Sequence, residues 1–414
     1  MLLILIREFL QDIRKQKLRT FLTVIAITWG TIAVVLLLSF GEGLGDRMLE
    51  GMLNAGNQMM IVYGGQTSKT YEGLNIGRPV RFTEEDVDML ARSIPQIEMI
   101  SPQYGRWGMH LRSEYASTTT YGEGVNPDFS AMRSMFAVAG GRFLNVRDVS
   151  EQRRVVFLGD NIAKRLFPDV DPVGKNVFID HVPFTVVGVM QEKFQTSMSN
   201  GPDADRAIIP HTTFRTMYGS RTVHSLLIRP TDPMNQEIVK DELARILGAK
   251  YKFDPTDERA LQIWDFIEAE QISRRVGLGV AIFLFTVGFF TLMIAGVGVA
   301  NIMYVAVKER TREIGIKKAV GARRWHITSQ FIFEAVFLAL LGGGIGLAFS
   351  ASVIFGVRSL GLDEGAWQFF GAPVLSEFTM LMTVGILTMI GFIAGVFPAR
   401  KAAGVDPVES LRYE

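Results

Sequence analysis

Four long stretches of the chain are almost free of charged side chains. They cover residues 20–40, 276–307, 325–357 and 378–399, and Glu334 is the one charged residue that interrupts them. Because a helix needs about 20 mainly apolar residues to cross the hydrocarbon core of a bilayer, each stretch is long enough for one membrane span. Residues 41–275 have an ordinary charge density and are long enough to fold as a domain. The pattern predicts one span, a large domain and then three spans.

Lysine and arginine residues concentrate next to particular ends of these spans. They precede residue 20, fill the link at 308–324 and follow residue 399, whereas the link at 358–377 has only Arg358. Because positively charged loops stay in the cytoplasm, we expect both termini and residues 308–324 inside, and residues 41–275 and 358–377 outside. A signal peptide cleaved near Ser39 is the alternative, but its apolar core is too long for a usual signal sequence.

The domain between the first two spans shows both helical and strand patterns. Thr83 followed by three acidic residues is typical of a helix start, and helical spacing continues from there to Pro95. Residues 155–158, 177–179 and 182–189 have the apolar pattern of strands. The predicted fold class is therefore a membrane protein with four transmembrane α-helices and a large α+β extracytoplasmic domain inserted between helices 1 and 2.

The segments next to the spans are predicted to be helical. Residues 1–19 have apolar side chains at steps of three and four, which is typical of an amphipathic helix lying along the inner membrane surface. Residues 41–58 and 257–275 are expected to form helical stalks. The predicted divisions are an interfacial helix (1–19), four spans (20–40, 276–307, 325–357 and 378–399), the outer domain with its stalks (41–275), a cytoplasmic coupling loop (308–324), a short outer loop (358–377) and a cytoplasmic tail (400–414).

The composition argues against several classes of function. The 43 basic and 42 acidic residues give a net charge of +1, which creates no field that attracts nucleic acid. The chain has no cysteine, and its five histidines lack metal-ligand spacing. Gly174-Lys175-Asn176 lacks the upstream glycine and the Ser/Thr of a phosphate-binding loop, and no GxSxG motif occurs. We therefore expect a non-catalytic chain with no cofactor, no metal and no nucleic-acid partner, embedded in the lipid bilayer.

Glu334 is the one acidic residue within the predicted spans. Ionisable residues inside a bilayer often belong to proton or ion relays, but a single carboxylate near the cytoplasmic end makes a poor relay. A pairing with a basic residue of the 308–324 loop is favoured, because an unpaired buried carboxylate is strongly unfavourable.

Small residues recur at four-residue steps in the spans, which is typical of helices whose backbones pack closely. This pattern predicts tight packing within or between subunits, although glycine is also common in membrane helices. The stripe in the third span continues to Ser350, and the residues expected to pack are Gly296, Ala300, Gly342, Gly346, Gly391 and Gly395.

The 308–324 loop has the features of a short rigid helix. Glu313 and Lys317 are spaced for an i,i+4 ion pair, and Gly321 suits the position just after a helix. Ile316, Ala319 and Val320 form a small apolar face, which could dock into a groove of a soluble partner. The alternative is a charged turn that only satisfies the preference for positive cytoplasmic loops.

At these residues the sequence resembles the MacB/FtsX-like permease family of ABC transporters. The resemblance covers both ends and the middle of the chain, and the loop and tail motifs are the most specific. It is carried by residues 17–20, 41–43, 153–190, 301–303, 308–324, 333–335, 398–403 and 406–414.

The resemblance implies a permease in the bacterial inner (plasma) membrane, with both termini cytoplasmic, that forms a homodimer and works with a cytoplasmic ABC ATPase. In MacB itself the ATPase precedes the permease on one chain, whereas here Met1 stands just before the interfacial helix, so a separate ATPase polypeptide is expected. The residues expected to couple the ATPase to the spans are Glu309, Arg310, Thr311, Arg312, Glu313, Ile314, Gly315, Lys317, Gly321, Ala322 and Arg323.

The family implies that ATP-driven movement is passed to the outer domain and exports a substrate from the periplasmic side. A periplasmic adaptor and an outer-membrane channel are further candidate partners. An FtsX-like regulator of a cell-wall hydrolase, an antibiotic sensor and a lipoprotein-release permease are the alternatives. The residues specify no cargo.

Overall fold

The computed structural model describes residues 17–196, 198–360, 368 and 371–404. The chain divides into a helical unit, formed by residues up to Arg47 and from Arg275 onward, and a domain from Met48 to Arg274. Most of the predicted interfacial helix at 1–19 lies outside the described residues. So do residues 405–414 of the predicted tail and most of residues 361–370 of the predicted outer loop.

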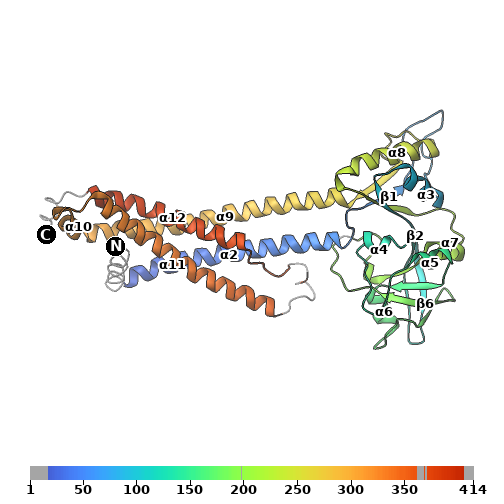
Figure 1. Ribbon diagram of the computed structural model, residues 1–414, viewed down its shortest axis with the longest axis horizontal. Helices are drawn as coiled ribbons and strands as arrows, with labels where there is room; N and C mark the ends of the chain where they lie inside the picture. Colours follow the sequence, from blue (N-terminus) through green and yellow to red (C-terminus); the bar gives the residue numbers. More distant parts are fainter. Residues whose placement is uncertain (1–16, 197, 361–367, 369–370, 405–414) are drawn as a thin grey trace. The chain divides into compact units, whose positions relative to one another are not determined.

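Among the described residues, four helices are long and apolar enough to cross a membrane, which confirms the four predicted spans. They are α2 (Lys17–Leu53), α9 (Phe266–Glu309), α11 (Arg324–Ser359) and α12 (Glu377–Gly404). A shorter helix, α10 (Thr311–Ala319), lies between α9 and α11. Apolar side chains from α2, α9, α10, α11 and α12 share one core that includes Ile27, Leu292, Ile314, Phe331 and Ala394. Figure 1 shows α11 and α12 running alongside each other.

The two predicted stalks differ. α2 continues without a break to Leu53, so most of the predicted helix at 41–58 is confirmed. The prediction for 257–275 is wrong in its first part, because residues Leu261–Asp265 form strand β9 and the helix begins only at Phe266. β9 pairs antiparallel with β1 (Met60–Gly64), so a distant strand supplies the hydrogen bonds that a helix would have made internally.

The domain is built on one sheet of nine strands in its described residues. The strands are β1 and β9, given above, with β2 (Ile97–Arg112), β3 (Ser117–Val125), β4 (Val155–Leu158), β5 (Asn176–Ile179), β6 (Val182–Val189), β7 (Arg206–Pro210) and β8 (Ser225–Pro230). The three strands expected from the sequence at 155–158, 177–179 and 182–189 correspond to β4, β5 and β6.

The long strand β2 divides this sheet into two parts. Its second half pairs with β3 and β5, which closes a ring in the order β2, β3, β7, β4, β6, β5. Its first half pairs with β8, which continues to β1 and the edge strand β9 as an open sheet. We call these two parts the ring and the open sheet.

Helices pack against both parts of the sheet and complete the α+β domain (Figure 1). The predicted helix start at Thr83 is confirmed, because its backbone N–H donates to Asp86 Oδ2 at 2.7 Å and opens α3 (Glu84–Ser93). The other helices are α4 (Phe129–Met132), α5 (Val146–Ser150), α6 (Asp160–Leu166), α7 (His211–Tyr218) and α8 (Gln236–Tyr251), with two 3-10 turns at Asp203–Asp205 and Pro233–Asn235.

Candidate functional site

The 308–324 segment folds as a helix held between two bends. α9 ends at Glu309, Arg310 leaves the helical conformation, and α10 follows directly. At the other end, Gly321 has φ +99°, its N–H donates to Lys318 O, and the N–H of Ala322 donates to Lys317 O, both at 3.0 Å. This double hydrogen bond around a left-handed glycine is the Schellman C-cap. The predicted short helix and the predicted role of Gly321 are both confirmed.

Because Gly321 sits at a positive φ, a side chain there is strained whatever space surrounds it. We expect Gly321→Ala to destabilise the C-terminal turn of α10 by about 1 kcal/mol. Hydrogen exchange of the amides at 317–322 measures this, and they should exchange about fivefold faster than in the parent protein. Gly404→Ala is the control, because it lies at the end of α12 and no neighbouring atom of the described residues lies within 4 Å of the new methyl group.

α10 is anchored to the helical unit on one side. Ile314 and Gly315 are buried, and Ile314 belongs to the shared apolar core of the spans. Lys318 Nζ donates to the carbonyl oxygen of Ala403 at the end of α12, 2.9 Å away. The predicted Glu313–Lys317 ion pair is present, with an N···O distance of 3.2 Å. Ile314 and Gly315, which are expected among the coupling residues, therefore lie on the side of α10 that packs against the spans.

A largely buried ion pair lies at the bend between α9 and α10. Arg310 Nη1 lies 3.0 Å from Glu334 Oε1 on α11, and the two side chains are 15% and 6% exposed. This confirms the prediction that Glu334 pairs with a basic residue of the 308–324 loop. Because both groups lose most of their hydration, the attraction between them offsets part of the desolvation cost of each.

The opposite side of α10 is open. Ile316 and Val320 are 48% and 85% exposed, and Ala319 is exposed beside them. This is the small apolar face that the sequence predicted, and we call it the α10 face. Of the other expected coupling residues, Glu309, Arg312, Glu313, Gly321 and Arg323 are exposed, whereas Arg310, Thr311, Lys317 and Ala322 are half-buried.

Two glycines bring α11 against α2. A methyl group on Gly346 would lie 2.7 Å from Thr31 Cβ and 2.9 Å from the backbone oxygen of Thr28. A methyl group on Gly342 would lie 3.0 Å from Ile27 Cβ, and Thr28 Oγ1 donates to Gly342 O at 2.9 Å. The predicted close packing is confirmed here, and it joins helices of the same chain.

The other small residues pack against further helices of the chain. A methyl group on Gly391 or on Gly395 of α12 would lie 2.9 Å from Ala339 Cβ or Ala335 Cβ of α11. Gly296 of α9 faces the side chain of Ile390 on α12, and Ala300 packs partly buried against the same core. The stripes therefore join α2, α9, α11 and α12 into one bundle.

A concave feature also lies in the domain. A cavity of about 780 Å³ opens near the end of β1, and its lining includes Gly65, Arg81, Arg259 and Gln262. No group of three or more His, Asp or Glu side chains suited to a metal ion occurs among the described residues.

Comparisons with known proteins agree with this arrangement. Residues 20–246 match the MacB-like periplasmic core domain, and residues 285–407 match the FtsX-like permease C-terminal region. The chain is 29% identical over 98% of its length to the macrolide export ATP-binding/permease protein MacB of Chlorobaculum tepidum, and 31% identical over 98% to that of Rhodospirillum rubrum. It is 32% identical over 96% to the pyoverdine export ATP-binding/permease protein PvdT of Pseudomonas fluorescens.

The matched part is only a portion of each relative. The chain covers 60% of the Chlorobaculum protein, 59% of the Rhodospirillum protein and 57% of the Pseudomonas protein. The core-domain match alone extends over more than half of the chain and includes its whole ring. The chain is a multi-pass membrane protein, and it belongs to the family that joins a MacB-like periplasmic core domain to an FtsX-like permease region.

Proposed function

We propose that this chain transmits ATP-driven movement from a cytoplasmic ABC ATPase to its periplasmic domain, and that the movement drives export of a substrate from the periplasmic side. In this proposal both termini and the 308–324 segment are cytoplasmic. The observation that carries it is the construction of α10, which is fixed firmly to the spans on one side and exposes Ile316 and Val320 on the other.

Anchoring makes α10 suitable for passing on a displacement. A force applied to the α10 face would reach α11 through the Arg310–Glu334 pair and α12 through Lys318. α9 begins at Phe266 in the domain and continues unbroken to Glu309, beside α10. At 1.5 Å per residue that helix is about 66 Å long, so a tilt at one end becomes a displacement at the other.

Export is favoured over the alternatives because the three relatives described above are named as exporters of macrolides or pyoverdine. A homodimer, a periplasmic adaptor and an outer-membrane channel belong to this proposal as partners. If the chain is instead an FtsX-like regulator, its partner should be a cell-wall hydrolase. A pull-down with the tagged chain from crosslinked cells that recovers a cell-wall hydrolase and no adaptor would favour the regulator.

We expect the double substitution Ile316→Ser and Val320→Ser to weaken ATPase binding by roughly tenfold or more, because exposed apolar anchors contribute much of the energy of an interface. The measurement is the ATPase activity that co-purifies with the affinity-tagged chain from solubilised membranes of its host. Both side chains are exposed, so the helical unit should keep its stability.

The matched control is Met293→Ser with Val297→Ser. These residues have the same i,i+4 spacing and are 41% and 64% exposed, but they lie in the middle of the apolar part of α9. The control should retain the ATPase. Equal loss of the ATPase in both double variants would contradict docking at the α10 face.

A further inference from the structure

The end of α2 is held by the loop that connects β6 to β7 in the ring. The N–H of Thr196 donates to Gly51 O at 3.1 Å, and Asn54 Nδ2 donates to Phe194 O at 2.9 Å. Lys193 Nζ donates to the carbonyl oxygen of Asn54 at 2.8 Å. Because the last carbonyl groups of a helix have no partners within the helix, these bonds complete the end of α2.

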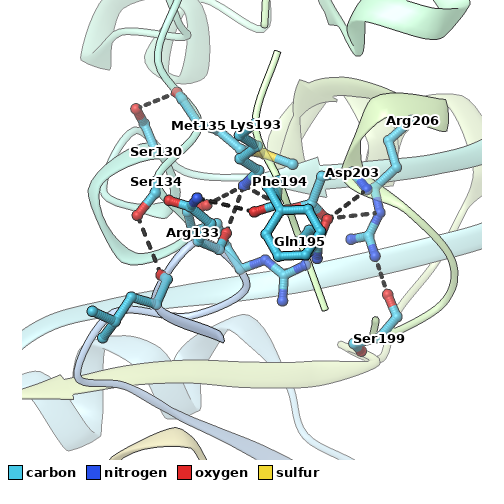
Figure 2. A network of polar contacts seen from close by, with 12 residues as sticks. Ser130, Arg133, Ser134, Met135, Lys193, Phe194, Gln195, Ser199, Asp203 and Arg206 are labelled. Atoms are coloured by element: carbon cyan, nitrogen blue, oxygen red, sulfur yellow. Dashed lines mark hydrogen bonds and ion pairs between the residues drawn. The ribbon is translucent and has the colours of Figure 1, made fainter. Parts of the chain in front are cut away.

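Lys193 occupies the centre of this attachment. Its ammonium group also donates to Arg133 O at 2.6 Å and lies 2.8 Å from Asp203 Oδ2 (Figure 2). The side chain is 8% exposed. An ammonium group has three N–H donors, and three oxygens surround this one. One buried charge therefore connects the helix end, the loop after α4 and the carboxylate of Asp203.

From Asp203 the contacts continue into the ring. Asp203 Oδ1 lies 2.6 Å from Arg133 Nη2 and 3.3 Å from Arg206 Nε, and Arg206 Nη1 lies 2.6 Å from Glu123 Oε1. Arg206 begins β7, and Glu123 lies in β3. Burial alone would raise the pKa of Asp203, but the charges of Arg133, Arg206 and Lys193 outweigh it and hold this pKa well below its usual range. A chain of buried ionisable side chains thus runs from the end of α2 to two paired ring strands.

The covalent path from α2 leads elsewhere. After Leu53 the backbone reaches β1, which pairs with β9, and β9 continues directly into α9. The backbone therefore joins the end of α2 to the open sheet from which α9 begins. The contacts of Lys193 attach the same helix end to the ring.

We propose that Lys193 is the joint that transmits a displacement of α2 to the ring. Moving Lys193 away from Asp203 and the two carbonyl oxygens would leave its buried ammonium group without partners, so the helix end, the loop and Asp203 move together. This inference rests on the proposed function, because it assigns the entry point of the movement into the domain. Lys193 is a positioning residue in this scheme.

Distances between spin labels in the full-length chain test the joint. The chain has no cysteine, so introduced cysteines are the only labelling sites. One pair, Met48→Cys with Ile272→Cys, reports the separation of α2 and α9, and both positions are more than half exposed. The second pair, Thr119→Cys with Ile272→Cys, reports the ring relative to α9 from an exposed position on β3. Each is measured with the ATPase, without nucleotide and with ATP and vanadate.

The test substitution is Lys193→Met, which removes the ammonium group and keeps an unbranched side chain that is one atom shorter. It leaves Arg133 and Arg206 beside the carboxyl groups of Asp203 and Glu123. These ion pairs remain, so the domain should fold. Thr196→Pro is the second variant, because it removes the bond to Gly51 from an exposed loop residue without touching a charge. The matched control is Lys164→Met, whose side chain is 67% exposed and pairs with Glu192 at the surface.

In the parent protein and in the Lys164→Met variant, we expect ATP and vanadate to change both label distances. In Lys193→Met the change in the α2–α9 pair should persist, whereas the change in the ring–α9 pair should fall to less than half. If both label distances in Lys193→Met change as they do in the parent protein, Lys193 does not transmit the displacement. The proposed function would then still stand. No change in either pair of the parent protein would overturn both.

Discussion

Replacement of Glu334 by alanine is expected to destabilise the helical unit by about 3–5 kcal/mol, because it removes one member of a largely buried ion pair. The Arg310 side chain is 15% exposed and lies 3.0 Å from Glu334 Oε1 at the bend before α10. Reversible unfolding of the full-length chain in mixed micelles measures the free energy of unfolding. The α10 segment should also become susceptible to proteolysis at Arg312, because its anchor on α11 is removed.

Two further variants identify the cause. Glu313→Ala removes the 58% exposed partner of Lys317 on α10 and should change the free energy of unfolding by no more than about 0.5 kcal/mol. The double variant Arg310→Met with Glu334→Met should recover most of the loss, since apolar residues can replace a buried ion pair with little loss of stability. Equal effects of Glu334→Ala and Glu313→Ala would contradict the anchoring role of Glu334.

A second large effect is expected from a single methyl group between α2 and α11. Gly346→Ala should destabilise the bundle by about 1–3 kcal/mol, the usual effect of overpacking. The new methyl group would lie 2.7 Å from Thr31 Cβ and 2.9 Å from the backbone oxygen of Thr28, so the helices must move apart. Unfolding in mixed micelles provides the free energy, as for Glu334.

Gly344→Ala is the control on the same helix. Among the described residues, no atom outside the local helix backbone lies within 4 Å of its new methyl group, so this variant should be as stable as the parent or more stable. Both substitutions gain the same helix propensity, about 1 kcal/mol, and this term cancels in their difference. If the two alanine variants unfold with the same free energy, the close approach of α2 and α11 does not contribute to stability.

The coupling segment was predictable in outline because its signals are local. The Glu313–Lys317 spacing, the glycine at 321 and the apolar residues at 316, 319 and 320 each refer to neighbours within one or two helical turns. The partner of Glu334 was not predictable, since the loop offers seven basic residues and the sequence does not distinguish among them. Selection of Arg310 depends on the bend between α9 and α10, which places this residue beside α11.

One wrong prediction and one missed contact in the domain have the same physical cause, which is pairing with residues far away in the chain. Residues 261–265 were expected to be helical, but β1 accepts them as its partner strand. Lys193 and Asp203 gave no sequence signal, because a charged residue in a loop is ordinarily a solvated one. Their burial follows from the packing of the β6–β7 loop against the end of α2.

The sequence by itself determined the four spans, the position of the inserted domain and the short helix at 308–324, because membrane insertion and helix formation depend on continuous runs of residues. Only the tertiary structure decided which small residues meet, which arginine neutralises Glu334, and how β2 belongs to both the ring and the open sheet. These contacts join residues far apart in the chain. Their energies depend on distance and burial in the folded molecule, which the order of residues does not specify.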